Sequence, residues 1–386
     1  MKVLKLIFKN SIRHKLRTFL TILGIAIAVI AFGVLRTVVT AWYAGVEASS
    51  ANRLITRQAV SFIFPLPLAY KDKIEKIDGV EKVTFANWFA GVYIDKNQFF
   101  ARLAVDADNY FDVYPEFVLS KSQLDAFKKE RNACVIGADI ARQYRLKIGD
   151  PMTIDGDIFP GRWDFVIRGI YQPRDKTTDA TQMLFHWDYV NERMKQEMPG
   201  RANQVGWYVE KITDPNKAGE ISDKIDALFK NSTSETKSES ERAFQQGFLQ
   251  STSAIITAMN VISFVIIGII MLVLGNTMIM AARERTREYA VMKTLGFSAR
   301  HITGLIMGES LLISFLGGVI GLLLTFPLIQ GISQIIPKGF FPIFQLEPIT
   351  VVLACSAALL IGIASSVFPI HRALNTKIVD GFRFVG

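Results

Sequence analysis

The sequence predicts an α-helical membrane protein with four transmembrane helices and a large α+β extracytoplasmic domain inserted between the first and the second. Three observations predict this fold. Half of the 386 residues are hydrophobic. Four apolar stretches reach the ~20 helical residues that cross a bilayer. The formal net charge of +9 is concentrated beside those stretches, which argues against a nucleic-acid-binding surface and for membrane topology.

The four apolar stretches contain almost no charged residues. They are residues 18–42, 243–282, 302–330 and 349–370. Arg36 lies near the far end of the first stretch, where its long side chain can reach the interface and act as an anchor. A cleaved signal peptide is disfavoured, because this first apolar body is long and a basic segment precedes it.

Basic residues flank the spans on one side only. Segments 1–17, 283–301 and 371–386 are rich in Lys and Arg, whereas the loop 331–348 has Lys338 alone and residues 43–242 are nearly balanced in charge. The positive-inside rule therefore puts the three basic segments in the cytoplasm. We expect a multi-pass protein of the bacterial inner membrane, with both termini cytoplasmic and residues 43–242 and 331–348 on the periplasmic side.

The segment before the first span has the pattern of a helix lying on the membrane. Leu4, Ile7, Phe8 and Ile12 recur at helical spacing, and Lys and Arg occupy positions elsewhere around the axis. Such a face can bury itself among the lipid headgroups. We therefore expect residues 1–17 to form an interfacial amphipathic helix that contacts membrane lipid.

The second span is too long for one membrane crossing. Residues 243–282 would form a helix of about 60 Å, twice the hydrocarbon thickness. We expect the excess to project on the periplasmic side, where the first span also continues past Trp42, so that both helices form a stalk. The alternative is an ordinary span preceded by a polar loop. The Ser/Thr/Glu-rich stretch 231–241 fits a linker in either case.

Residues 43–242 mix helix and strand patterns, which predicts an α+β domain with two subdomains. Strands are expected at 80–85, 133–136, 165–171 and 207–209, and helices at 70–77, 138–144 and 218–229.

No constellation for catalysis stands out. The sequence has no Gly-rich loop ending in Gly-Lys-Ser/Thr, and its four histidines are scattered. Cys355 lies inside an apolar stretch, so a disulfide with Cys134 is not expected. We therefore predict that the chain is not an enzyme by itself and binds no metal or cofactor.

The most distinctive stretch is the coupling segment, residues 283–296, where dense charge gives way to an apolar turn. Gly296 can end its helix. A short amphipathic helix of this kind can dock into a groove on a soluble partner, and the alternative is a simple positive-inside anchor. The residues assigned to this segment's contacts are Arg283, Glu284, Arg285, Arg287, Glu288, Val291, Met292, Leu295 and Gly296.

This segment closely resembles the coupling region of the permease family that includes the macrolide exporter MacB, the lipoprotein-releasing permeases and the cell-division protein FtsX. The shared core is Glu-Arg-x-Arg-Glu followed by an apolar turn and Leu-Gly, matched here from Glu284 to Phe297. Weaker similarities follow in the right order over essentially the whole chain. They are residues 10–24, 79–83, 135–141, 148–150 and 368–373, the last with Pro-Ile where the family usually has Pro-Ala.

The resemblance implies a permease subunit without a fused ATPase. Its partners would be a cytoplasmic ABC ATPase subunit, which binds the ATP and Mg²⁺, and a second permease copy or a paralogue. Closure of the ATPases would move the coupling segments, and the long second helix would carry that motion outward. The cargo would be a lipophilic substrate, lipoprotein, drug or peptide, with or without a periplasmic adaptor and outer-membrane channel. The alternative is an FtsX-like signalling subunit that activates a periplasmic enzyme without transport.

Polar and small residues inside the third span complete the candidate sites. Glu309 lies about 10 Å into this span. A carboxylate there is costly and faces the bundle, where we favour a structural role over a functional one. Gly304 with Gly308, and Gly317 with Gly321, form small-xxx-small pairs that permit close helix packing. Pro327 is expected to kink or end the helix.

Overall fold

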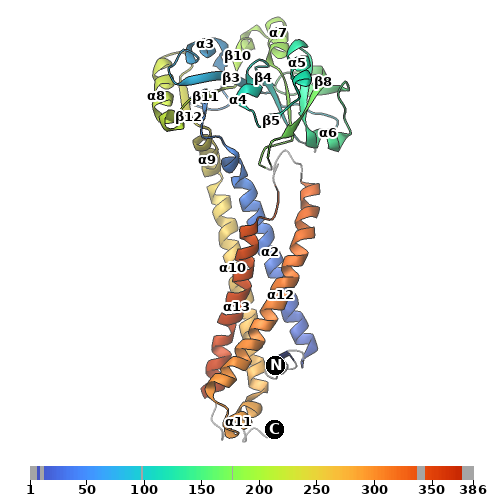
Figure 1. Ribbon diagram of the computed structural model, residues 1–386, viewed down its shortest axis with the longest axis vertical. Helices are drawn as coiled ribbons and strands as arrows, with labels where there is room; N and C mark the ends of the chain where they lie inside the picture. Colours follow the sequence, from blue (N-terminus) through green and yellow to red (C-terminus); the bar gives the residue numbers. More distant parts are fainter. Residues whose placement is uncertain (1–6, 9–12, 97–98, 176, 337–343, 376–386) are drawn as a thin grey trace. The chain divides into compact units, whose positions relative to one another are not determined.

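The computed structural model describes residues 7–8, 13–96, 99–175, 177–336 and 344–375. It separates into two compact units (Figure 1). The helical unit comprises the described residues up to Thr40, Ser253–Gln334 and those from Phe344 onward. The α/β domain comprises Ala41–Thr252.

Among the described residues, four helices are long and apolar enough to cross a membrane, which agrees with the predicted number. They are α2 (Lys15–Ala48), α10 (Ser253–Glu284), α12 (Ala299–Ile335) and α13 (Pro348–Asn375). Pro327 lies inside α12 and does not end it. The predicted interfacial helix lies largely outside the described residues, as do residues 337–343 of the predicted loop and residues 376–386 of the tail.

Close contacts between α2 and α12 show that these two helices run in the same direction. A Cβ added to Gly317 would lie 2.7 Å from Ile25, and one added to Gly321 would lie 2.7 Å from Val29. The residue numbers rise together on both helices, so the helices are parallel. Two helices that cross a membrane in the same direction must be parallel.

The contacts between α12 and α13 run in the opposite sense. Gly318 lies against Ala358, and Ser310 donates a hydrogen bond to the carbonyl of Gly362 at 2.7 Å. The residue numbers of α13 fall as those of α12 rise, so these two helices are antiparallel. The relative directions of α2, α12 and α13 therefore match those required by the predicted topology.

The two glycine pairs of α12 have different surroundings. Gly317 and Gly321 both pack against α2, as a close-packing pair should. Gly308 lies against the side chain of Ile7, whereas a Cβ at Gly304 would meet no described atom within 4 Å. A close contact therefore accompanies the predicted packing role at Gly308, Gly317 and Gly321, but not at Gly304.

The long second helix is interrupted, which corrects the prediction of one continuous helix over 243–282. Helix α9 (Glu241–Ser251) ends before Thr252, and α10 begins at Ser253. Thr252 donates from both its backbone N–H and its hydroxyl to the carbonyl of Leu249. Such local hydrogen bonds of Thr compete with the helical pattern. The residues before this span are nevertheless helical rather than a polar loop, since α9 begins at Glu241.

The α/β domain is built on one ten-stranded sheet, in the order β12-β1-β11-β3-β4-β9-β6-β8-β5, with β7 paired to β8. Two pairs, β4 with β9 and β6 with β8, are parallel, and the other pairs are antiparallel. The strands are β1 (Arg53–Gln58), β3 (Val80–Trp88), β4 (Ala101–Val105), β5 (Phe117–Val118), β6 (Ala133–Gly137), β7 (Pro151–Gly156), β8 (Gly161–Pro173), β9 (Gln182–His186), β11 (Trp207–Ile212) and β12 (Thr236–Ser240). A separate pair joins β2 (Leu66–Pro67) to β10 (Gln204–Val205).

The helices of this domain pack on the sheet around a core rich in aromatic side chains, among them Trp163, Phe165 and Phe185. They are α3 (Lys71–Ile74), α4 (Tyr110–Val113), α5 (Lys121–Lys129), α6 (Ala138–Tyr144), α7 (Trp187–Glu197) and α8 (Ala218–Leu228). The four predicted strands and the helices at 138–144 and 218–229 are present. The helix predicted at 70–77 is only one turn, α3.

The predicted linker at 231–241 is wrong, because β12 is an edge strand of the sheet. It pairs antiparallel with β1 from Leu54↔Ser240 to Gln58↔Thr236. Its hydroxyl side chains are used inside the domain: Ser238 and Thr236 both donate to the carboxylate of Asp226 in α8. Residues that favour a linker by composition thus form a strand by satisfying their hydroxyls against a neighbouring helix.

Glu210 is fully buried in β11, and neither of its carboxyl oxygens has a hydrogen-bond partner among the described residues. Burial raises its pKa from 4.5 to about 8. Between these two values the folded protein holds the proton and the unfolded chain has lost it. The contribution of Glu210 to stability is therefore fully present below about pH 4.5 and is lost as the pH rises through about 8.

We predict that Glu210→Gln removes this pH dependence. In the unaltered protein the free energy of unfolding of the α/β domain should fall between about pH 5 and pH 8, by at most ~1.4 kcal/mol per pH unit from this one group. The amide should flatten that slope, because it does not titrate. Thermal unfolding of the full chain from pH 5 to 9 measures it, and parallel profiles of the two proteins would contradict the assignment.

Candidate functional site: the coupling segment and its ties

The coupling segment folds as the short helix α11 (Thr286–Thr294), which follows α10 after a turn at Arg285 (Figure 1). Its end has the geometry predicted for Gly296. The N–H of Gly296 donates to Lys293 and that of Phe297 to Met292, and Gly296 has a φ of +84°. This paired arrangement is the Schellman motif, which needs a residue that tolerates a left-handed backbone.

A buried ion pair joins the coupling segment to α12. Arg285 Nη1 lies 2.7 Å from Glu309 Oε2, and Arg285 Nη2 lies 3.3 Å from Glu309 Oε1. Both side chains are less than a tenth exposed. Arg285 is thus unavailable as a docking contact, which corrects the role predicted for it. Glu309 has a structural partner of opposite charge, as an intramembrane carboxylate requires.

The two acidic residues of the segment are paired with basic residues at the start of the chain. Glu284 accepts hydrogen bonds from Arg17 at 2.9 and 3.0 Å, and His14 lies 3.3 Å away. Glu288 pairs with Arg13. These pairs are largely exposed, so each contributes little to stability, but together they connect the coupling segment to α2 and the residues just before it.

Lys293 connects the segment to the end of α13. Its ammonium group donates to the carbonyls of Ala373, at 3.1 Å, and Leu374, at 2.8 Å. The last carbonyls of a helix have no partner within the helix, and a cation there also interacts favourably with the helix dipole. Lys293 therefore works as a C-terminal cap supplied by a different helix.

The rest of the segment divides into an inward and an outward face. Tyr289 is buried, and Met292 is partly buried against the helix core. Arg283, Arg287, Val291 and Leu295 are exposed, with Leu295 at 71%. Gly296 is also exposed and ends the helix. The segment thus presents outward two arginines followed by two apolar side chains.

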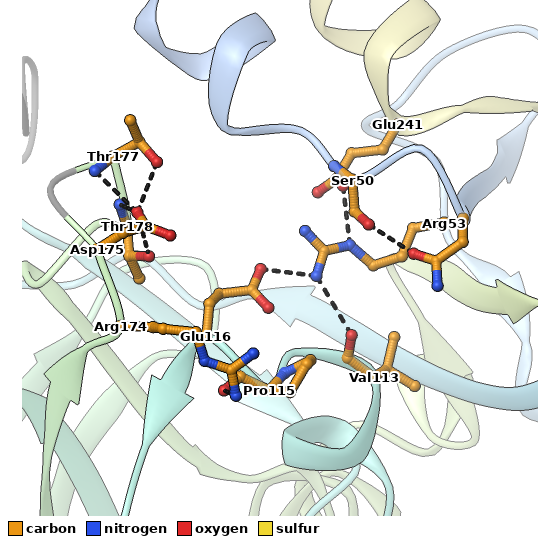
Figure 2. Close-up of polar contacts among 11 residues, drawn as sticks. Ser50, Arg53, Val113, Pro115, Glu116, Arg174, Asp175, Thr177, Thr178 and Glu241 are labelled. Carbon is orange, nitrogen blue, oxygen red and sulfur yellow. Dashed lines mark hydrogen bonds and ion pairs between the residues drawn. The ribbon is translucent and has the colours of Figure 1, made fainter.

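A second polar cluster fastens α9 to the sheet of the α/β domain (Figure 2). Arg53, the first residue of β1, donates to Glu241 at 2.8 Å and to Glu116 at 2.6 Å. It also donates to the carbonyl of Val113, and Glu241 accepts a hydrogen bond from the N–H of Ser50. Burial opposes the charge on Arg53, but the carboxylates of Glu241 and Glu116 outweigh it and raise the pKa of Arg53.

This Arg53 cluster joins three segments that are far apart in the sequence. Glu241 is the first residue of α9, Glu116 follows α4, and Arg53 follows the end of α2. Beside Glu116, Arg174, the residue after β8, donates to the carbonyl of Pro115 at 2.5 Å (Figure 2). The start of α9 is therefore held to β1 and, through Arg53, to Val113 and Glu116.

Sequence reasoning missed several of these functional contacts. It treated Lys293, Arg13 and Arg17 only as positive charges beside the membrane, and it assigned no role to Arg53. One signal for Arg53 was available. Its strand, Arg-Leu-Ile-Thr-Arg-Gln, begins with a charge at a position that the sheet buries. A buried charge requires a partner.

Comparisons with known proteins match both parts of the chain. Residues 18–228 match the MacB-like periplasmic core domain, and residues 260–378 match the FtsX-like permease C-terminal domain. An uncharacterized ABC transporter permease of Methanocaldococcus jannaschii is 23% identical over 97% of this chain and 96% of its own length.

Two further similarities cover parts of the chain. The macrolide export ATP-binding/permease protein MacB of Nitrobacter winogradskyi is 24% identical over 64% of this chain, which spans 37% of the MacB length. The crystal structure of the periplasmic region of MacB from Actinobacillus actinomycetemcomitans covers 53% of this chain and 95% of that structure, with 13% identity and a TM-score of 0.38. The MacB-like domain alone accounts for more than half of the chain. The chain therefore belongs to the MacB/FtsX-type permease family of ABC transporters.

Proposed function

We propose that this permease couples ATP hydrolysis by a separate ATPase subunit to motion of its α/β domain. In this proposal the coupling segment faces the cytoplasm, the α/β domain is periplasmic, and both termini are cytoplasmic. ATP and Mg²⁺ bind the ATPase partner, while this chain binds no cofactor and works as a dimer with a second copy or a paralogue.

The observation that carries the proposal is that the coupling segment is tied to every membrane helix. It follows α10 directly, Arg285 pairs with Glu309 of α12, Lys293 caps α13, and Glu284 pairs with Arg17 of α2. A surface anchor that only marks the inner side of the membrane needs none of these connections. A force applied to α11 would instead be shared by the whole bundle.

The Arg53 cluster supports the second half of the proposed path. Helix α9 is separated from α10 by the single residue Thr252, and its first residue, Glu241, is bound to Arg53 of β1. Arg53 in turn binds Glu116 in the loop after α4. A displacement of α9 would therefore reach the sheet through buried, charge-assisted hydrogen bonds, which resist deformation better than solvated ones.

The proposed cargo is a lipophilic substrate, a lipoprotein, a drug or a peptide, moved from the outer face of the inner membrane, directly or through a periplasmic adaptor and outer-membrane channel. An FtsX-like signalling role is the second candidate. The size of the α/β domain favours transport, because FtsX-type external domains are usually smaller than the 41–252 unit found here.

Docking of the ATPase is predicted to depend on the exposed face of α11. The double substitution Arg287→Glu with Leu295→Asp should reduce co-purification of the ABC ATPase that accompanies the unaltered chain by at least about tenfold, because it reverses one charge and removes one apolar anchor. Membrane insertion and thermal stability of the permease should stay unchanged, since both side chains are exposed.

Lys15→Glu supplies the matched control, because Lys15 is exposed and lies outside the coupling segment. It makes the same charge change as Arg287→Glu and should leave the ATPase bound. Full ATPase binding by the double variant, or equal loss in the control, would contradict the docking surface assigned here.

A further inference from the structure

An apolar loop, residues 60–64, stands out on the surface of the α/β domain. It connects β1 to β2 and contains no charged residue. Val60 is 78% exposed, Ile63 88% and Phe64 52%. Single exposed apolar residues are ordinary on a protein surface, but several adjacent ones at this level of exposure mark a contact surface.

Hydrogen bonds inside the loop hold it in this conformation. The N–H groups of Val60 and Ser61 donate to Gln58 Oε1 at 2.7 and 3.0 Å. The N–H of Ile63 donates to Ser61 Oγ at 3.3 Å, and that of Phe64 donates to Ser61 O at 3.2 Å. Four backbone donors are therefore already used within the loop. A hydrocarbon environment requires this, because it offers no partner for an N–H group.

Aromatic contacts fix the loop on the domain. The Phe62 ring lies 4.9 Å from Trp207 of β11 and 5.3 Å from Phe244 of α9, centroid to centroid. With Phe62 turned onto these rings, Val60, Ile63 and Phe64 remain outward. The apolar surface is thus preorganised, which lowers the entropy cost of binding. It is also supported by α9, the helix that the proposed function moves.

We propose that the apolar loop binds the hydrocarbon chain of a lipid-bearing cargo. The three outward side chains offer a patch of at most a few hundred Å², well below the ~800 Å² per partner of a standard protein interface. The missing charges and the internally satisfied N–H groups favour an occupant without polar groups. The inference rests on the proposed function and narrows its cargo to molecules that carry an acyl chain.

The test uses the full chain in nanodiscs of phosphatidylcholine and phosphatidylglycerol. In a Cys355→Ser background, Ile63→Cys is labelled with the environment-sensitive dye NBD, and Cys134 stays unlabelled because it is buried. The probe is a short peptide with an N-terminal palmitoyl chain, compared with the same peptide acetylated. We expect a saturable blue shift with the palmitoyl peptide alone. Ile148→Cys, at an exposed isoleucine outside the loop, should show none.

A second variant tests the surface rather than the label. Val60→Ser with Phe64→Ser should weaken the apparent affinity for the palmitoyl peptide by roughly tenfold or more, because it removes two apolar contacts. The melting temperature should not change, since both side chains point outward.

Three results would overturn the inference. Quenching of the dye on the Ile63→Cys variant by doxyl-labelled phosphatidylcholine, before peptide is added, would identify the bilayer as the occupant. Bis-maleimide crosslinking between the introduced thiols of two Ile63→Cys chains would identify a second copy. The absence of any response to the palmitoyl peptide would show that the apolar loop does not bind an acyl chain. Co-purification of the ATPase, measured on the same samples, shows whether the proposed function itself still stands.

Discussion

Glu309→Ala is expected to lower the free energy of unfolding of the helical unit by about 3–5 kcal/mol, because it leaves the buried guanidinium of Arg285 without its counter-charge. Arg285→Ala should cost a similar amount by stranding the carboxylate. Denaturation of the full chain in detergent micelles, followed by tryptophan fluorescence and gel mobility, measures both. The control Arg17→Ala breaks a pair with an exposed partner, Glu284, and should cost less than about 1 kcal/mol.

Replacing both partners separates stability from coupling. Arg285→Met with Glu309→Leu removes both charges and fills the space with apolar atoms, a change that is often neutral or stabilising. We expect the double variant to regain most of the lost stability and still bind the ATPase, yet to couple ATP hydrolysis poorly, because the charge-assisted tie between the coupling segment and α12 is gone. Full coupling of ATP hydrolysis in the double variant would show that the Arg285–Glu309 pair contributes to packing only.

Arg53→Ala should also lower stability by about 3–5 kcal/mol, here in the α/β domain. Arg53 is 4% exposed and pairs with two carboxylates, buried Glu241 and half-buried Glu116, which would be left without this cation. Hydrogen exchange of the full chain should show faster exchange of the first turn of α9, since Glu241 loses its tie to β1.

Arg57→Ala is the matched control on the same strand. Arg57 pairs with Glu239 at 3.4 Å, and both side chains are partly solvated. Its loss should cost no more than about 1 kcal/mol and leave exchange in α9 unchanged. Equal effects of the two substitutions would show that the Arg53 cluster is not a special fastening of α9.

The membrane fold was predictable because its signals are local. A run of apolar residues long enough to cross a bilayer identifies a helix from length alone, and four such runs correspond to α2, α10, α12 and α13. The end of α11 was predictable for the same reason, since Gly296 supplies the left-handed residue of the motif.

The partners of the charged residues were not predictable, because they depend on tertiary packing. A segment such as Arg-Glu-Arg-Thr-Arg-Glu has the composition of a solvated surface, yet Arg285 turns inward at the junction between α10 and α11. One clue existed. Glu309 inside an apolar helix demands a cation, and Arg285 is among the basic residues that flank the membrane helices.

The errors in the α/β domain have a related cause. The Ser/Thr/Glu composition of β12 suits a linker, and only the pairing with β1 and the bonds to Asp226 make it a strand. The helix break at Thr252 could not be predicted from the uncharged stretch. Such a stretch indicates an apolar segment, but it does not show where a hydroxyl side chain competes for a backbone carbonyl.

The central claim is that motion of the coupling segment reaches the α/β domain through the helix bundle, to which the Arg285–Glu309 pair ties that segment. Double electron–electron resonance on the complex with its ATPase tests it, with a spin label on Asp125→Cys of α5 in each copy and Cys355→Ser as background. A change in the label separation between nucleotide-free and ATP-bound states is predicted. It should be lost in Arg285→Met with Glu309→Leu although the ATPase remains bound. An unchanged separation in the unaltered protein, or an undiminished change in the double variant, would contradict the account.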